Sequence, residues 1–478
     1  MSVKAVSLLD RMTTSYKNGN TTAKPSTVTI NCVLDALAKS GEREASNEAK
    51  ALLLRMRDST DPCFDTVNLD TISYTSVIDA YAKSGAPDAA QNAEEVFELM
   101  KTDYENGNMA AKPNTKTVNT VMNAWVQSGR KGSTSRADTL LRKLEDSTDE
   151  TLQPDVVSYS IVMKGYAKSS EHDAVSKTKQ VFDRMVAAYE GGNPNARPNV
   201  HSYTALITAI LRSNARDAAE RAERIVRIMQ KEYEEGNEYA KPTTLALTMV
   251  IDAWAKSGHR DAGERAEALL NWLLDIYDET NDPAVEPNAM TFSAAMNAWA
   301  KSKDFQKSLK AKTILDKMIA LHESGKMAAK PNTLVITTLI NACAYTQGEQ
   351  SAKTEAFHTA TEAFKQLYKS KYGRPNHVTY TTYMVACRNL LPAGEGRTQS
   401  IEAVLRRCCQ DGQLDKIVVE KAERIMEPER LQAFFGDAVS RDNRIDLTLL
   451  PQEWTKNVQS KPRRQQQRQR PRYHNKSP

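Results

Sequence analysis

The side chains that most often perform catalysis or bind metals are scattered along this chain and form no known constellation. The six cysteines include no CxxC pair, and none lies beside histidines at zinc-finger spacing. There is no GxxxxGK[ST] phosphate loop, no GxSxG nucleophile turn and no HExxH zinc motif, because His322-Glu323 lacks a second histidine. His358 stands alone, and the zinc-deaminase pattern HxE…PCxxC is absent. We therefore expect no enzyme activity, no metal site, no cofactor and no small-molecule substrate.

Composition narrows the class of protein further. Of 478 residues, 40% are apolar and 26% charged, which is enough apolar material for a large core. Nineteen glycines and 18 prolines exclude a collagen-like or broadly disordered chain. No apolar run approaches the ~20 residues that span a bilayer, so we expect no membrane protein. Six cysteines in so long a chain make no disulfide framework, and we interpret them as reduced.

The net charge of +5 is concentrated at the C-terminus. Residues 460–478 carry seven of the 65 basic residues and no acid, which leaves 58 basic against 60 acidic residues in the rest of the chain. The body is therefore slightly acidic, and any electrostatic argument for nucleic acid must be local. We expect the tail to be a disordered basic segment, which either adds nonspecific RNA affinity or is only solvated.

A repeated block organises the rest of the chain. A proline and a short polar residue precede a helical segment that often ends in Ala-Lys-Ser, and units then recur in steps of 41 to 45 residues. Nine units at so steady a period predict a helical array rather than a globular enzyme. The first residues of the units are Thr27, Thr71, Thr115, Val156, Val200, Thr244, Ala289, Thr333 and His377.

Each unit is predicted to form two helices. In the first, the fourth, seventh, eighth and eleventh places are apolar, as in Tyr74, Val77, Ile78 and Tyr81, which is the stripe of an amphipathic helix. The tenth place is always Ala or Gly, so two helix backbones can approach closely. A second amphipathic helix follows in each unit. A Gly then signals the end of that helix, and a Pro signals the start of the next unit.

The two ends depart from this pattern. Residues 1–26 copy only the second half of a unit, so we expect a partial repeat with an unpartnered face and suspect that sequence is missing upstream. After about residue 391 the repeat fades. Residues 411–459 are expected to form capping helices that end the array of units 27–410.

The first segments resemble the first helix of the pentatricopeptide repeat family. Pro154-Asp155 followed by Val-Val-Ser-Tyr-Ser-Ile-Val-Met-Lys-Gly-Tyr-Ala-Lys-Ser carries the resemblance, as does the segment 71–85. The family's usual unit is about 35 residues. Here about three residues extend the turn between the helices (84–91) and about six extend the loop after the second helix. The resemblance implies an all-α, right-handed solenoid of antiparallel helical hairpins that binds single-stranded RNA, one base per unit.

In the family, the fifth residue of a unit and its last residue, just before the next unit, choose the base. Family rules pair Asn/Asp with U and Thr/Asn or Ser/Asn with A, which implies U-A-U-A-?-A-A-A from 5′ to 3′. The ninth unit offers Thr381 without a clear partner. Carried over to this chain, the pairs are Asn31/Asp70, Thr75/Asn114, Asn119/Asp155, Ser160/Asn199, Thr204/Thr243, Thr248/Asn288, Ser293/Asn332 and Thr337/Asn376.

A structural explanation of the same residues stands beside this one. Every last-place residue is a preferred N-cap, so capping alone explains its type. It does not explain why the fifth place is polar in all nine units. Short amide, carboxylate and hydroxyl groups there can reach the edges of unstacked bases.

Two further positions fit an RNA-binding face. The thirteenth place carries six cations, which stacking would align along a phosphate backbone, although a cation near a helix C-terminus also suits the helix dipole. The second place is mostly apolar, and in the family it wedges between bases; ordinary packing is the alternative. The cations are Lys39, Lys83, Lys168, Arg212, Lys256 and Lys301, and the wedge residues are Val28, Ile72, Val157, Leu245, Met290, Leu334 and Val378.

Taken together, the resemblance implies a sequence-specific RNA-binding protein that acts on A/U-rich transcripts in a mitochondrion or chloroplast. It would protect, process or help translate them, with RNA-processing proteins as further partners. The competing hypothesis is a protein-binding scaffold of the tetratricopeptide type. The polar fifth place and the row of cations favour RNA.

Overall fold

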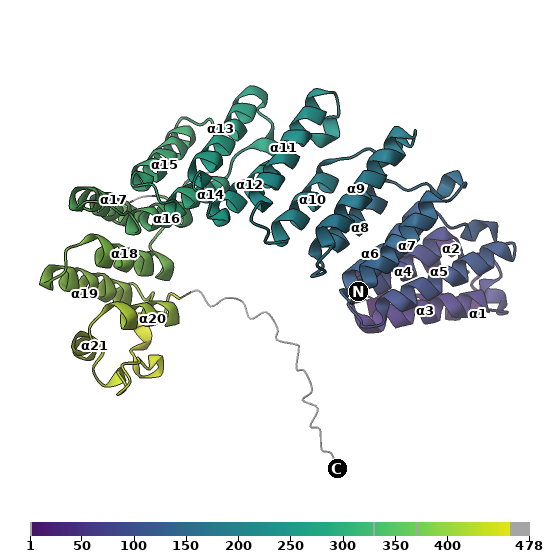
Figure 1. Ribbon diagram of the computed structural model, residues 1–478. Coiled ribbons are helices and arrows are strands. Elements are labelled where there is room, and N and C mark those ends of the chain that lie inside the picture. Colours follow the sequence, from purple (N-terminus) through teal and green to yellow (C-terminus); the bar gives the residue numbers. More distant parts are fainter. Residues whose placement is uncertain (1, 328–329, 370, 459–478) are drawn as a thin grey trace, which may run out of the picture. The chain divides into compact units, whose positions relative to one another are not determined.

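The computed structural model describes residues 2–327, 330–369 and 371–458, and the basic tail predicted at 460–478 lies outside them. In this part of the chain the structure consists of α-helices and short 3-10 turns, with one isolated bridge between Val439 and Ile445 and no β-strand. Successive α-helices form antiparallel hairpins (Figure 1). The prediction of an all-α solenoid of helical hairpins is therefore confirmed by the helices and their packing.

The chain divides into two compact units, Met1–Pro242 and Thr243–Pro478, which are described separately. In the first unit, a helix that belongs to no complete hairpin precedes five hairpins. The first helices of these hairpins pack on one another, α2 on α4, α4 on α6, α6 on α8 and α8 on α10. The first helices are α2 (Thr27–Ser40), α4 (Thr71–Ser84), α6 (Thr115–Ser128), α8 (Val156–Lys168) and α10 (Val200–Arg212); the other helices are α1 (Ser2–Lys17), α3 (Arg43–Arg57), α5 (Ala89–Glu105), α7 (Ser133–Glu145), α9 (Ala174–Glu190) and α11 (Ala218–Glu234).

The second unit continues the pattern with four hairpins and a C-terminal segment. Its first helices also pack on one another in chain order. They are α12 (Thr244–Ser257), α14 (Ala289–Lys301), α16 (Thr333–Ala344) and α18 (His377–Leu390); the second helices are α13 (Ala262–Thr280), α15 (Lys307–Glu323), α17 (Gln350–Lys369) and α19 (Glu395–Gln410), and α20 (Lys416–Ile425) and α21 (Pro428–Phe435) follow.

Local signals explain where the first helices begin and end. Each begins at the residue that heads its sequence repeat, after an Asn, Asp, Ser or Thr whose side chain accepts a backbone N–H of the first turn. Four of them end at a left-handed glycine, as α4 does at Gly85 with φ 62°. The apolar stripe is buried, with Tyr74, Val77 and Ile78 each 0% exposed. The smallness of the tenth place is required at Gly165, where a Cβ would lie 2.7 Å from the Thr134 methyl group.

The sequence predicted a polar loop after each second helix, and the structure shows an ordered turn there. From η1 (Thr21–Ala23) to η7 (Pro283–Val285) a 3-10 turn follows the second helix, and an Asn or Asp precedes it. Asn108 is one example, since its side chain accepts the Ala110 N–H and donates to the Leu69 carbonyl at 2.8 Å. The expected turn between helices is shorter than 84–91, because α5 already begins at Ala89. The other turns of this kind are η2 (Pro62–Phe64), η3 (Met109–Ala111), η4 (Glu150–Leu152), η5 (Pro194–Ala196) and η6 (Glu238–Ala240).

The register that fades in the sequence after residue 391 continues in the structure. Helix α20 packs on α18 as one first helix packs on the next, and Asp415 caps it by accepting the Val418 N–H at 2.9 Å. The step from His377 to Lys416 is 39 residues. This shorter step explains why the pattern was missed. Three 3-10 turns, η8 (Gly436–Ala438), η9 (Leu447–Leu449) and η10 (Gln452–Trp454), follow α21.

Candidate nucleic-acid interface

The predicted last-place residues all act as helix N-caps. In each case a side-chain oxygen accepts the N–H of the third residue of the next first helix, as Asn332 does from Val335 at 3.1 Å. The amide Nδ2 of Asn114, Asn288, Asn332 and Asn376 donates to no group in the described part of the chain. Capping thus uses the oxygen of each amide and leaves its nitrogen available as a donor. The caps are Asp70, Asn114, Asp155, Asn199, Thr243, Asn288, Asn332 and Asn376.

Two fifth-place asparagines bind the last-place carboxylate of their own unit directly. Asn31 Nδ2 donates to both oxygens of Asp70 at 3.1 and 3.2 Å. Its Oδ1 accepts the Ser73 hydroxyl at 2.6 Å, so the orientation of the amide is fixed from both sides. Asn119 repeats the arrangement with Asp155 at 3.0 Å.

Three fifth-place threonines reach the last place through a second hydroxyl. Thr75 lies 2.9 Å from Thr117, and Thr117 donates to Asn114 Oδ1 at 3.1 Å. Thr117 has one hydroxyl hydrogen, which it donates to Asn114. Between the two threonines, Thr75 must therefore be the donor and Thr117 the acceptor. The pairs Thr248/Thr291 and Thr337/Thr379 make the same chain to Asn288 and Asn376.

The remaining fifth-place residues are not joined to their last-place partners in this way. Ser160 Oγ is buried with no hydrogen-bond partner among the described residues. Ser293 pairs instead with Thr338 at 2.9 Å. Thr204 and Thr381 donate to carbonyls one turn back in their own helices, those of Val200 and His377.

The second-place residues are exposed, whereas ordinary packing at the start of a helix would bury them. Their exposed fractions run from 45% at Val378 to 70% at Val28. Apolar side chains so exposed at the same place of seven first helices remain available for a ligand. The other five are Ile72, Val157, Leu245, Met290 and Leu334.

All six predicted phosphate-binding cations are exposed, but three of them form ion pairs. Lys39 pairs with Asp35 at 2.6 Å, Lys83 with Asp79, and Lys256 with Asp252, always one turn back along the helix. The hydrogen bond that Lys39 donates to Asp35 raises the pKa of Lys39, so this ammonium stays charged. These exposed pairs are weak individually, but they reduce the local positive charge that the sequence suggested.

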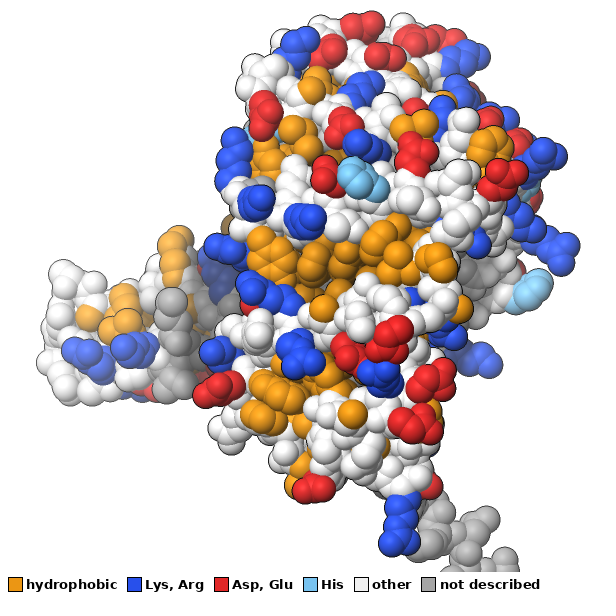
Figure 2. Space-filling model, turned by 90° about the vertical axis from the view of Figure 1, so that its left-hand side faces the viewer, with side chains coloured by type: hydrophobic (Ala, Val, Ile, Leu, Met, Phe, Trp, Pro, Cys, Tyr) orange, Lys and Arg blue, Asp and Glu red, His pale blue; other side chains and the backbone are white. Residues whose placement is uncertain are grey.

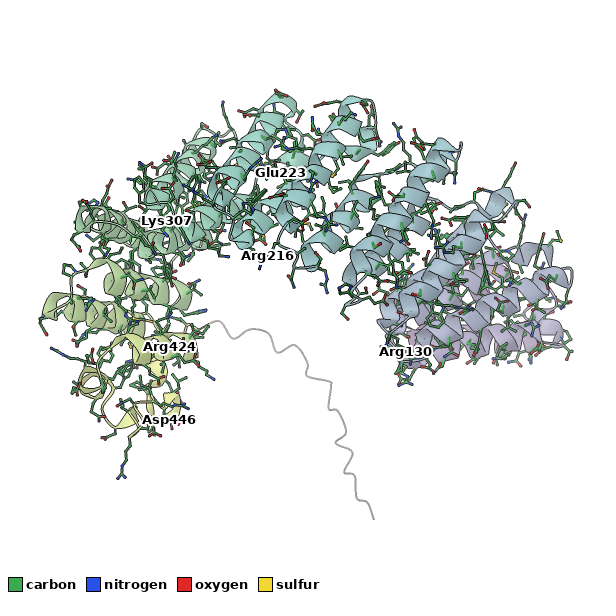
Figure 3. All side chains as sticks on the ribbon, in the orientation of Figure 1. Arg130, Arg216, Glu223, Lys307, Arg424 and Asp446 are labelled. Atoms are coloured by element: carbon green, nitrogen blue, oxygen red, sulfur yellow. The ribbon has the colours of Figure 1, made fainter. Side chains whose placement is uncertain are left out.

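The other three cations make no ion pair in the described ranges. Lys168 and Arg212 line one hollow at the hairpin turns together with Arg130 and Lys131, and Glu171 is the one acid in its lining. Arg130 is labelled in Figure 3. Lys301 ends α14 in the same thirteenth place. Four cations and one acid therefore lie together at the turns of the third, fourth and fifth hairpins of the first unit.

Two features of the site were missed from sequence. Asp415 takes the last place of the ninth unit, and His377 Nε2 lies 3.8 Å from it. The hydroxyls that join fifth and last places, such as Ser73 and Thr117, occupy the third place of the following unit. A Ser or Thr three residues after most caps was visible in the sequence, but its two partners were not.

Buried ionisable groups elsewhere serve packing. Lys307 is 4% exposed and donates to the carbonyls of Ala300 and Ser302 at the end of α14, and burial lowers its pKa. Glu223 is 5% exposed and binds Arg227 at 2.7 Å; both buried groups are labelled in Figure 3. No group of three His, Cys, Asp or Glu side chains that could hold a metal occurs in the described ranges.

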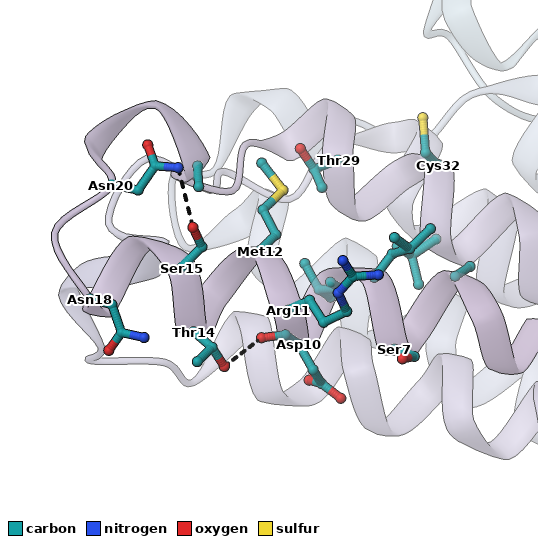
Figure 4. Close-up of a pocket in the computed structure, with 15 residues that line it drawn as sticks. Ser7, Asp10, Arg11, Met12, Thr14, Ser15, Asn18, Asn20, Thr29 and Cys32 are labelled. Atoms are coloured by element: carbon teal, nitrogen blue, oxygen red, sulfur yellow. Dashed lines mark hydrogen bonds between the residues drawn. The ribbon is translucent and has the colours of Figure 1, made fainter.

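The open side of the first helix pair forms a pocket (Figure 4). It is lined by α1 and α2, with Leu8, Met12 and Val33 beside polar groups such as Asn20, which donates to Ser15 at 3.2 Å. Its lining shows no paired acid and base. Figure 2 shows acidic and basic side chains mixed over the face drawn, with hydrophobic side chains in a band across its middle.

Comparison with known proteins finds one family model and similar solved structures. Residues 72–104 match the family model of the PPR repeat. No curated protein matches the chain. Among solved structures, the pentatricopeptide repeat protein PPR10 from maize is similar at 18% identity with a TM-score of 0.29, and the match covers 91% of this chain and 65%, less than two thirds, of that one.

The stacked first helices, with polar side chains at fixed places along them, define a helical-repeat protein. No helix among the described residues is long and apolar enough to cross a membrane. One unit matches the family model directly, and the same pattern heads nine units in phase. The chain is therefore similar, over residues 72–104, to the PPR repeat family.

Proposed function

We propose that this protein binds single-stranded, A/U-rich RNA sequence-specifically, with one base for each unit. The observation that carries the proposal is the direction of the hydrogen bonds between fifth-place and last-place side chains. At the five junctions where they form, these bonds leave a particular set of donors and acceptors unused. The set is complementary to one base edge.

At the threonine junctions the unused groups suit adenine. Because Thr75 donates to Thr117, its oxygen can only accept from a ligand, while Asn114 Nδ2 can donate. Adenine presents the opposite pair on its Watson–Crick edge, an N6 amino donor and an N1 acceptor. The same holds for Thr248/Asn288 and Thr337/Asn376, which supports A at the second, sixth and eighth bases.

At the asparagine junctions the unused groups suit uracil. Asp70 keeps carboxylate lone pairs that can accept the uracil N3–H, and the second amide hydrogen of Asn31 can donate to a uracil carbonyl. Asn119 and Asp155 repeat these groups. The family rule for U at the first and third bases thus has a physical explanation in this chain.

The remaining predicted positions supply sequence-independent binding. Exposed apolar residues at the second place can intercalate between unstacked bases, and exposed cations at the thirteenth place can neutralise phosphates. Asp415 would give the ninth unit a reading pair with Thr381. The protein would act sterically, by covering RNA of a mitochondrion or chloroplast and protecting it or presenting it to processing or translation factors.

Selection from a randomised single-stranded RNA pool tests the proposal. We expect enrichment of U-A-U-A-N-A-A-A and much weaker binding to the same sequence in a duplex, whose base edges are paired. Enrichment of no sequence would overturn the proposal. Specific capture of a protein ligand instead would support the tetratricopeptide-like scaffold.

The salt dependence of RNA binding tests the phosphate contacts separately. Each phosphate contact to a single strand contributes about −0.7 to the log–log salt slope, so three unpaired and three paired cations predict a slope between about −2 and −4. Lys301→Ala should weaken binding and reduce the slope by about 0.7. Lys365→Ala, on the second helix α17, is the control and should change neither. Equal effects of the two variants would remove Lys301 from the interface.

A further inference from the structure

At most junctions the third residue of the following first helix carries a hydroxyl group and is fully buried. Such side chains cannot touch RNA. Their burial is nevertheless not apolar packing, because every one is hydrogen-bonded to a side chain of a predicted reading pair. These residues are Ser73, Thr117, Ser158, Thr291 and Thr379, each 0% exposed.

Each of these hydroxyls joins the two side chains of the preceding unit's reading pair. Ser158 Oγ lies 2.7 Å from Asn119 Oδ1 and 2.9 Å from Asp155 Oδ1, and its one hydrogen is shared between these two acceptors. Thr379 lies 2.8 Å from Thr337 and donates to Asn376 Oδ1 at 3.0 Å. The hydroxyl donates its one hydrogen to the amide or carboxylate oxygen of the pair. It therefore determines how the fifth-place side chain orients its own donor.

We propose that the third-place hydroxyl of the following unit is a positioning residue for base choice. The inference rests on the proposed RNA-binding function. With the hydroxyl present, Thr337 is held as an acceptor, which distinguishes the adenine N6 amino donor from the guanine O6 acceptor. Without it, Thr337 is free to donate or accept, and guanine gains relative to adenine.

The chain contains its own contrast. Unit six has Ala246 and unit eight has Val335 at the third place, and neither side chain has a hydroxyl. At the junction between units seven and eight, Ser293 forms a hydrogen bond with Thr338 instead. Ser202 donates to the Asn199 backbone carbonyl, which leaves Ser160 Oγ unpartnered. Base preference in the wild type should therefore be sharp at bases one, two, three, six and eight, and weak at bases four, five and seven.

Variants at two junctions test the inference by selection from a randomised RNA pool. Thr379→Val removes the hydroxyl with little change of shape, and the preference for A over G at the eighth base should fall about tenfold, the typical worth of one base-edge contact. Thr379→Ser keeps the hydroxyl and should keep the preference. Val335→Thr adds a hydroxyl at a junction that lacks one and should sharpen the preference for A at the seventh base.

The outcomes separate this inference from the function on which it rests. If the wild type enriches the expected RNA and neither Thr379→Val nor Val335→Thr alters its own base, the third place is structural only and the inference is wrong. If Thr379→Val does not fold, Val335→Thr and the uneven wild-type profile decide. If the wild type enriches no RNA at all, the proposed function fails and the inference fails with it.

Discussion

Asn332 shows how one side chain can serve the helix and the proposed ligand together. Its Oδ1 accepts the Val335 N–H, and its Nδ2 donates to nothing in the described part of the chain. The cap therefore needs an oxygen, whereas base choice needs the nitrogen. A substitution that keeps the oxygen and removes the nitrogen separates the two roles.

Asn332→Asp makes that substitution. Asn and Asp cap helices about equally well, so the melting temperature should hardly change. The donor becomes an acceptor-only carboxylate, and the preference at the seventh base, which is only weakly for A in the wild type, should move toward G by about tenfold. Selection with wild type and variant, beside thermal unfolding of both, is the measurement. Identical enrichment at that base would show that Asn332 is only a cap.

At the scale of helices, neighbouring hairpins are held by side chains that reach back to the previous second helix. Trp299 of α14 donates its Nε1–H to Glu267 of α13 at 2.9 Å, and its ring lies against the backbone of Gly263. A Cβ at Gly263 would lie 2.6 Å from that ring. The indole is 3% exposed and fixed by its hydrogen bond, so it has no room to move.

Gly263→Ala should destabilise the protein by about 1–3 kcal/mol through this clash. Gly396 is the matched control, because it is also the second residue of a helix, α19, and a Cβ there meets nothing within 4 Å. Gly396→Ala should be neutral or stabilise by about 0.5–1 kcal/mol, as expected for Gly in a helix. Urea unfolding of both variants checks the pair; equal shifts would contradict the close approach of Trp299.

Helices were predictable where the signals are local, and contacts between units were not. The cap, the apolar stripe and the left-handed glycine lie within about fifteen residues, so the boundaries of α4 and α12 follow from sequence. The ion pair between Lys256 and Asp252 was also predictable from the sequence, because the two residues are four apart on one helix. The burial of the third place and the role of Asp415 were not, because each depends on a partner about 40 residues away.

At the scale of the whole molecule, charge is nearly balanced outside the tail, and the thirteenth-place cations are partly offset by neighbouring acids. Three of those cations have an aspartate one turn back. Exposed pairs of this kind contribute only about 0.2–1 kcal/mol to folding. Their main effect would fall on RNA binding, because the acid lies beside the proposed phosphate contact.

Asp252→Asn should therefore tighten RNA binding by about two- to fivefold at low salt and make the salt slope steeper, with little change in stability. Asp183→Asn is the control, because Asp183 also pairs with a lysine four residues away, Lys179 at 2.6 Å, but on the second helix α9. Fluorescence anisotropy over a salt series measures both. Tighter binding by the control as well would point to overall charge rather than to this row.

The threonine that begins many first helices binds the end of its own repeat. At Thr27, Thr71, Thr115, Thr244 and Thr333 the hydroxyl donates to the carbonyl two residues before the next cap, at 2.7 to 3.0 Å. Each of these repeats is therefore closed on itself by a bond from its first side chain to a backbone carbonyl near its end, which any residue there can supply. A repeat closed in this way could be removed as one cassette, because excision of residues 71–114 would leave the bond from Thr27 to the Asn68 carbonyl intact. The RNA footprint of such a shortened array would lose one nucleotide.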